Sequence, residues 1–222
     1  MKKLLLVLVS FAVGGAQANG YGLINLSEVD GSSRTQFSAG FSSVEFDIES
    51  DPGVGRGEIE RQLIGGGVSM GFHGNMAFYA FFGFSLESSI EGIPGDDTGF
   101  LFGVGMKAEV YRQNKMTLNV FGDASYAIEE YGQGIEGTLA EFRLGSVANF
   151  DLARNLSGFF GLVLVPFSDG TLEIAGADVD IERDDMLGVI FGINFKVNKF
   201  NIRPEAEVIG EKRFSIMVDF AI

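Results

Sequence analysis

The sequence predicts an all-β protein: a closed, antiparallel, up-and-down β-barrel that crosses a membrane, with ten strands or, as the alternative, eight. Three observations support this prediction. Hydrophobic residues make up 46% of the chain, yet no apolar run beyond residue 18 reaches the roughly 20 residues that a membrane-spanning helix needs. Apolar and polar residues instead alternate at period two, which is typical of strands with one apolar face. Short turns and long acidic loops also alternate strictly along the chain, as they do in up-and-down membrane barrels.

The alternation runs through whole segments. The stretch GFLFGVGMKAEVY places Phe100, Phe102 and Val104 on one face, and Lys107 and Glu109 on the other. Counting such segments gives ten strands, an even number that returns both chain ends to the same side of a membrane. The predicted strands cover residues 34–48, 58–72, 76–87, 99–111, 115–129, 137–150, 156–168, 186–197, 200–209 and 213–222.

Two regions leave the strand count open. The stretch 21–29 is strand-like, and including it would make eleven. Leu172 with Ile174, and Val179 with Ile181, also alternate with other residues, so an outward hairpin formed by the seventh and eighth strands is a further possibility. Eight strands would remain if two of the assignments failed.

The connections between the strands fall into two classes. In barrels inserted from the periplasm, short turns lie on the periplasmic side and longer loops lie outside. Short turns are predicted at 73–75, 112–115, 151–155 and 198–199, and long acidic, glycine-rich loops at 49–57, 88–98, 130–136 and 169–185.

The first residues have the layout of a secretory signal peptide. They carry two lysines, an apolar run over 4–13, and the small-residue pattern Ala16-Gln17-Ala18. The apolar run is too short to span a bilayer as a helix; a short membrane anchor is the alternative interpretation. We expect a signal peptide over 1–18, a periplasmic N-terminal lead over 19–33 and a transmembrane barrel domain over 34–222.

The chain ends in RFSIMVDFAI, an alternating strand with no polar tail. Its apolar positions are Phe214, Ile216, Val218, Phe220 and Ile222. This end resembles the terminal strand by which the barrel-assembly machinery recognises outer-membrane proteins, although the last residue is Ile222 and not an aromatic.

Nearly the whole chain resembles the small Gram-negative outer-membrane β-barrels of the opacity-type and porin-like superfamily. The resemblance implies a barrel fold and an integral location in the outer membrane of a Gram-negative bacterium. The partners it implies are outer-membrane lipid, lipopolysaccharide and, during insertion, the barrel-assembly machinery. It implies no activity.

The chain is strongly acidic and has no cysteine. Its formal net charge is −14, and −16 once Lys2 and Lys3 are removed with the signal peptide. A charge of this sign excludes the binding of nucleic acid or of anionic lipid through the overall charge, and a disulfide framework is excluded as well. We expect no cofactor, and the sequence does not indicate an oligomeric state.

The residues opposite the lipid-facing set predict an interior with charges of both signs. Side chains can fill a barrel of eight to ten strands, and buried charges are expected to pair. A packed, salt-bridged interior is therefore one interpretation. A narrow, weakly cation-preferring pore is the other, because the acidic residues outnumber the basic ones. The charged residues predicted for the interior are Arg61, Lys107, Glu109, Asp123, Glu129, Glu141, Arg143, Lys196, Arg203, Glu205, Glu207 and Asp219, joined by Asn149, Asn194, Tyr79, Phe81, Phe121, Phe159, Val163, Ile190 and Met217.

No catalytic residue is predicted. A lipid-modifying enzyme would need a serine and a histidine near the outer leaflet, but the only histidine, His73, lies in a predicted periplasmic turn. The acidic loops are interpreted as solvated surface, with divalent-cation binding as the alternative. The candidate ligands for such an ion are Asp178, Asp180, Asp184 and Asp185.

The sequence therefore predicts a non-enzymatic barrel with a surface or structural role and acidic extracellular loops. A small passive channel is the first alternative function. A lipid-modifying enzyme is the second.

Overall fold

A computed structural model describes residues 35–50, 56–90, 98–131, 134–184, 186–209 and 212–222. In this part of the chain there is no helix with the length and apolar character needed to cross a membrane. The predicted signal peptide, the lead over 19–33 and the strand-like stretch 21–29 lie outside the described residues. The strands are β1 (Thr35–Ser50), β2 (Arg56–His73), β3 (Met76–Ile90), β4 (Gly99–Gln113), β5 (Met116–Glu130), β6 (Glu136–Ala153), β7 (Leu156–Ile174), β8 (Ala177–Arg183), β9 (Leu187–Val197), β10 (Phe200–Val208) and β11 (Lys212–Ala221).

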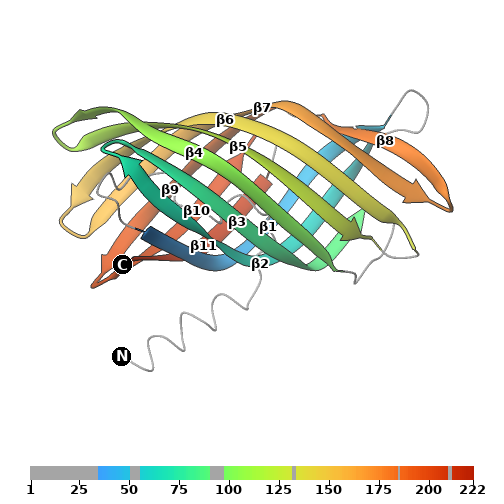
Figure 1. Cartoon of the computed structure of the whole chain (residues 1–222), viewed down its shortest axis with the longest axis horizontal. Coiled ribbons are helices and arrows are strands. Elements are labelled where there is room, and N and C mark those ends of the chain that lie inside the picture. Colours follow the sequence, from blue (N-terminus) through green and yellow to red (C-terminus); the bar gives the residue numbers. More distant parts are fainter. Residues whose placement is uncertain (1–34, 51–55, 91–97, 132–133, 185, 210–211) are drawn as a thin grey trace.

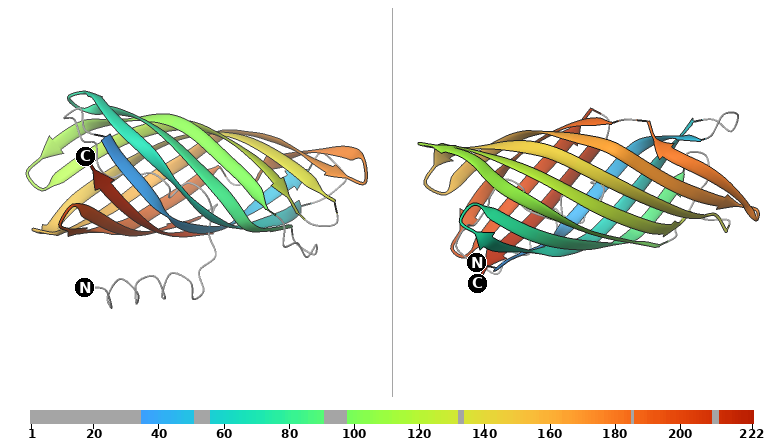
Figure 2. Two further views of the ribbon diagram at one scale, coloured as in Figure 1. Left: turned by 60° about the horizontal axis from the view of Figure 1, so that its bottom comes forward. Right: turned by 45° about the horizontal axis from the view of Figure 1, so that its top comes forward.

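Ten of these strands close into an antiparallel barrel, which confirms the predicted fold class and strand number. Consecutive strands are hydrogen-bonded neighbours from β1 to β7, then β9, β10 and β11 follow, and β11 returns to β1. This last seam runs over ten residue pairs, from Gln36↔Ala221 to Glu45↔Lys212. The strands run obliquely around the axis, as closure of a barrel requires (Figures 1 and 2).

The two ends of the barrel differ. Tight turns at 74–75, 114–115, 154–155 and 198–199 gather at the end that also carries the C-terminus, which we call the short-turn end (Figure 1). The longer connections lie at the opposite end, which we call the loop end. This is the alternation of short and long connections that the sequence predicts.

One strand departs from the up-and-down order. β7 continues beyond its predicted end at residue 168 to Ile174, turns at Ala175–Gly176 and returns as β8, so most of the predicted loop 169–185 is a hairpin. β8 also pairs with β1 at Ile48–Ser50, beyond the loop-end limits of β10 and β11. Towards the loop end, β8 alone therefore lies between β7 and β1, in place of β9, β10 and β11. The barrel has two strands fewer around its circumference there.

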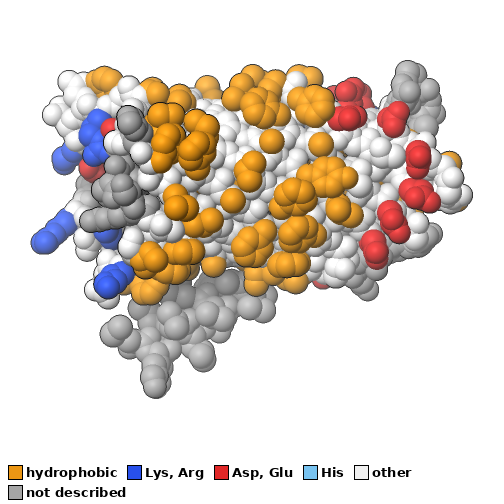
Figure 3. All heavy atoms as spheres, in the orientation of Figure 1, with side chains coloured by type: hydrophobic (Ala, Val, Ile, Leu, Met, Phe, Trp, Pro, Cys, Tyr) orange, Lys and Arg blue, Asp and Glu red, His pale blue; other side chains and the backbone are white. Residues whose placement is uncertain are grey.

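On the face shown in Figure 3, outward side chains form an apolar band across the middle of the barrel, and exposed apolar residues occur on the other strands as well. Lysine and arginine gather beyond this band at the short-turn end, and aspartate and glutamate beyond it at the loop end (Figure 3). Aromatic pairs lie near both borders: Phe72 stacks on Phe78 at 4.3 Å between ring centroids, and Phe84 lies 5.2 Å from Phe100. An apolar band with aromatic borders is the surface that outer-membrane barrels present to lipid.

Glycines on the inner face let large rings lie against the barrel wall. A Cβ atom on Gly103 would lie 2.2 Å from Cζ of Phe81, and one on Gly105 would lie 2.6 Å from Cζ of Tyr79 and from Cβ of Asp123. Those distances are too short for a side chain, so the interior rings are accommodated only because the facing positions have none.

This contact generates a stability prediction. Replacing Gly105 with alanine should lower the free energy of unfolding by about 1–3 kcal/mol, because the added methyl overpacks the bore. Gly57→Ala is the matched control, since its Cβ atom would have no neighbour closer than 3.8 Å. Urea unfolding in phospholipid vesicles measures both variants, and equal midpoints would contradict the proposed close approach.

Candidate functional site

The interior of the barrel is the candidate site, and most of the predicted residues are buried in it. Glu109 and Lys196 are exceptions: Glu109 is partly exposed and pairs with the exposed Arg112 near the β4–β5 turn, and Lys196 is exposed one residue before the end of β9. Both lie at the short-turn mouth, outside the buried network. All nine predicted amide, aromatic and aliphatic residues are buried there. Ten of the twelve predicted charged residues are buried with them: Arg61, Lys107, Asp123, Glu129, Glu141, Arg143, Arg203, Glu205, Glu207 and Asp219.

The largest group of ion pairs joins β10 to β11. The Arg203 guanidinium contacts Glu205 and lies 3.4 Å from Oδ2 of Asp219. Arg213 lies 3.1 Å from Oε1 of Glu205 and 2.9 Å from Oε2 of Glu207. Two arginines and three carboxylates from adjacent strands therefore form one continuous network, as the high cost of an unpaired buried charge requires.

A second group lies on β3, β5 and β6. Arg143 donates two hydrogen bonds to Asp123, from Nε at 2.8 Å and from Nη2 at 2.9 Å. The Tyr79 hydroxyl donates to Oδ2 of the same carboxylate at 2.7 Å. A bidentate arginine–carboxylate pair with a third donor is a strong, directional arrangement, and it fixes three neighbouring side chains across the bore.

A third group lies towards the loop end. Nε of Arg61 lies 2.6 Å from Oε2 of Glu129, and Nη1 of Arg183 donates to Glu141 at 3.1 Å. Both guanidinium groups lie over the ring of Phe46, at 4.8 Å and 5.1 Å from its centroid. The interior charges at this level are thus held by carboxylates and by the face of one aromatic ring.

Tyr131 completes this third group from the connection that follows β5. Its hydroxyl donates to Oε2 of Glu129 at 2.6 Å. Burial first, and the charge of Glu129 second, raise the pKa of the Tyr131 phenol, so it remains a neutral donor.

Among the described residues, the buried positive and negative charges inside the barrel are equal in number, which removes the basis for the expected cation preference. Arg183 and Arg213 were missed by the sequence analysis, and they offset the acidic excess that the predicted set contained. Both could have been found from the period-two alternation. Arg183 lies on the same face as Val179 and Ile181, and Arg213 lies on the inward face of the last strand. The buried cations are Arg61, Lys107, Arg143, Arg183, Arg203 and Arg213, and the buried anions are Asp123, Glu129, Glu141, Glu205, Glu207 and Asp219.

Towards the loop end the barrel reverses its polarity. Val44, Phe46 and Ile48 of β1 are buried inside, while Glu45 and the other odd-numbered residues of that part of β1 point outward. β2 changes in the same way, and β8 has the reversed pattern throughout. The loop-end part therefore has the alternation of a soluble β-protein. The buried apolar side chains there include Val44, Phe46, Ile48, Ile59, Leu63, Ile90, Leu101, Leu139, Leu172 and Ile181.

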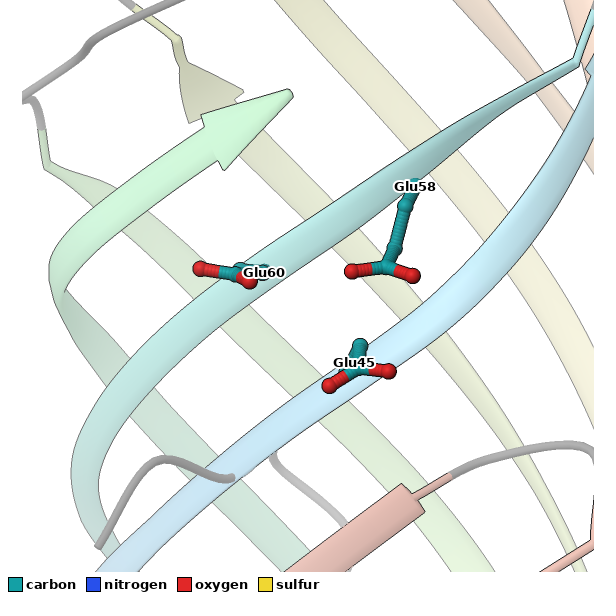
Figure 4. A group of neighbouring side chains, drawn as sticks. All are labelled: Glu45, Glu58 and Glu60. Carbon is teal, nitrogen blue, oxygen red and sulfur yellow. The ribbon is translucent and has the colours of Figure 1, made fainter. Parts of the chain in front are cut away.

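An acidic cluster lies on the outside of this part of the barrel. Glu45, Glu58 and Glu60, on the neighbouring strands β1 and β2, have oxygens within 4.8 Å of one another (Figure 4). Lys212 contacts Glu45 and lies 4.0 Å from Glu58, so an ammonium group already neutralises part of the cluster.

The four predicted cation ligands lie elsewhere. Asp178 and Asp180 are exposed on the outer face of β8, and Asp184 pairs with Arg56 at 3.4 Å. Asp185 lies outside the described residues. Within the described chain, the three-carboxylate cluster is formed by the glutamates of β1 and β2, and none of the predicted aspartates belongs to it.

The two other features singled out by the sequence lie at the short-turn end or on the outer face. His73 ends β2, directly before the tight turn at 74–75. The C-terminal residues Phe214, Val218 and Phe220 point outward into the apolar band, with 37–39% of each side chain exposed. Ile216 is half-buried on the same face, and Ile222 is exposed.

The Asp123–Arg143 pair generates a prediction. Asp123→Leu or Arg143→Leu alone should lower the free energy of unfolding by roughly 3–5 kcal/mol, because each leaves a buried charge without its partner. The double variant should lose much less than the sum of the two. Arg56→Gln, at an exposed pair, should cost under about 1 kcal/mol. Additive losses in urea titrations would show that the two charges are not coupled.

No protein-family model matches the sequence, and no curated protein matches it either. Solved structures do match. The outer membrane protease OmpT from Escherichia coli is similar over 89% of this chain and 100% of its own, with 6% identity and a TM-score of 0.58. The translocator domain of the autotransporter NalP from Neisseria meningitidis covers 100% and 94%, with 12% identity and a TM-score of 0.42. The KdgM porin covers 84% and 99%, with 8% identity and a TM-score of 0.40. At such identities the likeness to OmpT is one of fold alone: the chain has the fold of an outer-membrane β-barrel.

Proposed function

We propose that this chain is a closed, non-enzymatic β-barrel of the outer membrane of a Gram-negative bacterium, with a surface or structural role and an acidic outer end. The state of the bore is the observation that carries the proposal. In the described strands, six buried cations balance six buried anions, and ion pairs join five of the cations to carboxylates. The apolar cluster runs along the interior and is densest in the loop-end part. A bore filled in this way offers ions no polar path.

The orientation follows from the connections. With the short turns in the periplasm, the acidic loop end faces outward, where its partners would be outer-membrane lipid and lipopolysaccharide. Divalent cations prefer oxygen ligands and would bridge its carboxylates to lipid phosphates. The alternating C-terminal residues Phe214 to Ile222 would be the part that the barrel-assembly machinery recognises.

A catalytic role is not part of the proposal. The only histidine of the chain ends β2 at the short-turn end, far along the barrel from the acidic exterior. The buried carboxylates take part in ion pairs with arginine. Proteolysis is an activity of OmpT, and at 6% identity a shared fold carries no activity with it.

The conductance of a planar bilayer tests the closed bore. The chain without residues 1–18, refolded and shown by protease protection to be inserted, should give no discrete current steps, because five of its six described buried cations are paired with carboxylates and apolar side chains pack beside these pairs towards the loop end. Reproducible steps from inserted protein would overturn the proposal and favour the passive channel. Release of fatty acids from lipid vesicles that contain the refolded protein would overturn the proposal in favour of a lipid-modifying enzyme.

A further inference from the structure

The apolar band contains a groove. It lies on the outward wall formed by β6, β7, β9, β10 and β11 and has a volume of about 550 Å³, within the range of roughly 300–1,000 Å³ that is usual for small-molecule sites. Its lining is almost wholly apolar and includes Leu152, Gly158, Phe160, Phe191, Pro204 and Phe214.

The groove exists because small residues stand between large ones. Gly158 pairs with Ile193 across the β7–β9 ladder, and Phe160 pairs with Phe191 one row further along. Pro204 lies in a gap of the β9–β10 ladder, as expected for a residue without a backbone N–H. Glycine and proline thus form a low floor, and the rings of Phe160 and Phe191 stand beside it, each about half exposed.

Cations lie next to the groove at the short-turn end. Arg154 is in the β6–β7 turn, Lys199 is in the β9–β10 turn, and Lys196 precedes that turn; all three are exposed. The backbone N–H of Lys196 donates to the carbonyl of Asn155 at 3.0 Å, which holds the two turns side by side. Ile193 on the groove floor is three residues from Lys196, about 10 Å along an extended strand.

These cations are available to a ligand. In the described part of the chain none of the three lies within ion-pair distance of a carboxylate, whereas Arg112, at the neighbouring β4–β5 turn, is paired with Glu109. The two turns and the strand ends beside them, residues 151–156 and 196–201, contain one acidic residue, Asp151, so they carry a positive excess.

We infer that this groove binds an acyl chain of an anionic glycerophospholipid of the periplasmic leaflet, with the phosphate held by Arg154, Lys196 and Lys199. The inference rests on the proposed function for one point, that the short-turn end faces the periplasm. An apolar groove that leads to these three exposed cations fits a molecule with an apolar tail and an anionic head. Lipopolysaccharide would meet the opposite, acidic end of the barrel.

A second copy of the chain fits the groove less well. Two copies in one membrane have their short-turn ends at the same level, and a symmetric contact through the groove would place the three cations of one copy near those of the other. Like charges brought together in this way oppose association.

Brominated lipids test the inference, because the chain has no tryptophan. Phe160→Trp places a single reporter on the groove wall, and Phe78→Trp, outward on β3 in the short-turn half, is the matched control. Each variant is reconstituted in equal amounts of phosphatidylglycerol and phosphatidylcholine, with one of the two lipids brominated. At position 160, brominated phosphatidylglycerol should quench roughly threefold or more strongly than brominated phosphatidylcholine. At position 78 the two brominated lipids should quench about equally.

Charge variants locate the headgroup. The variant Arg154→Gln/Lys196→Gln/Lys199→Gln should abolish the preference for phosphatidylglycerol at position 160, since the lipid loses the attraction of three surface cations. Lys212→Gln, at the loop end, should leave the preference unchanged. All four positions are exposed, so folding, checked by heat-modifiable migration in gels, is expected to survive.

The other outcomes overturn the inference. Equal preferences at positions 160 and 78, or a preference that survives the triple neutralisation, would remove the cation site. Quenching that falls as the protein-to-lipid ratio rises would identify a second copy as the occupant. Displacement by lipopolysaccharide but not by phosphatidylglycerol would identify the other leaflet. Failure of the proposed function is distinguishable, because a chain that does not insert shows no quenching at either position.

Discussion

The seam between β1 and β11 is the constraint on which the rest of the structure depends. Inside a bilayer every backbone N–H and C=O must find a partner within the protein, so a sheet that spans it has to close. Ten residue pairs between Gln36–Glu45 and Lys212–Ala221 achieve that closure. Once the sheet is closed, period two leaves each residue only two directions: outward into the apolar band, or inward into a narrow bore.

The side chains inside the bore change in character along its length. Within the apolar band the inside carries both charged and apolar side chains, and arginine–carboxylate pairs such as Arg143–Asp123 satisfy the buried charges. Towards the loop end the outside is acidic and the inside is apolar. Phe46 lies at the change, with the guanidinium groups of Arg61 and Arg183 over its ring. Paired charges and apolar side chains together line the interior along the described strands.

Much of this structure could be predicted from the sequence, because alternation at period two is a local signal. It gave ten strand positions and the inward direction of Asp123 and Arg143. What could not be predicted depends on contacts between distant strands. The pairing of β8 with β1 and the burial of Arg183 follow from the early ends of β10 and β11. Lys196 is exposed because it lies at the mouth of the barrel. The alternation of residues along a strand does not show where the barrel ends. The groove beside Gly158 needs five strands to form.

The central claim is that the bore is filled and closed to water. Because the chain has no cysteine, Ser215→Cys supplies a single thiol at a fully buried position, where the serine hydroxyl lies 2.9 Å from that of Ser42. Asn155→Cys, in an exposed turn, is the control. A charged, thiol-specific reagent applied to folded barrels should modify Asn155→Cys at once, and Ser215→Cys only after unfolding. Modification of Ser215→Cys in the folded barrel at the control rate would contradict the claim.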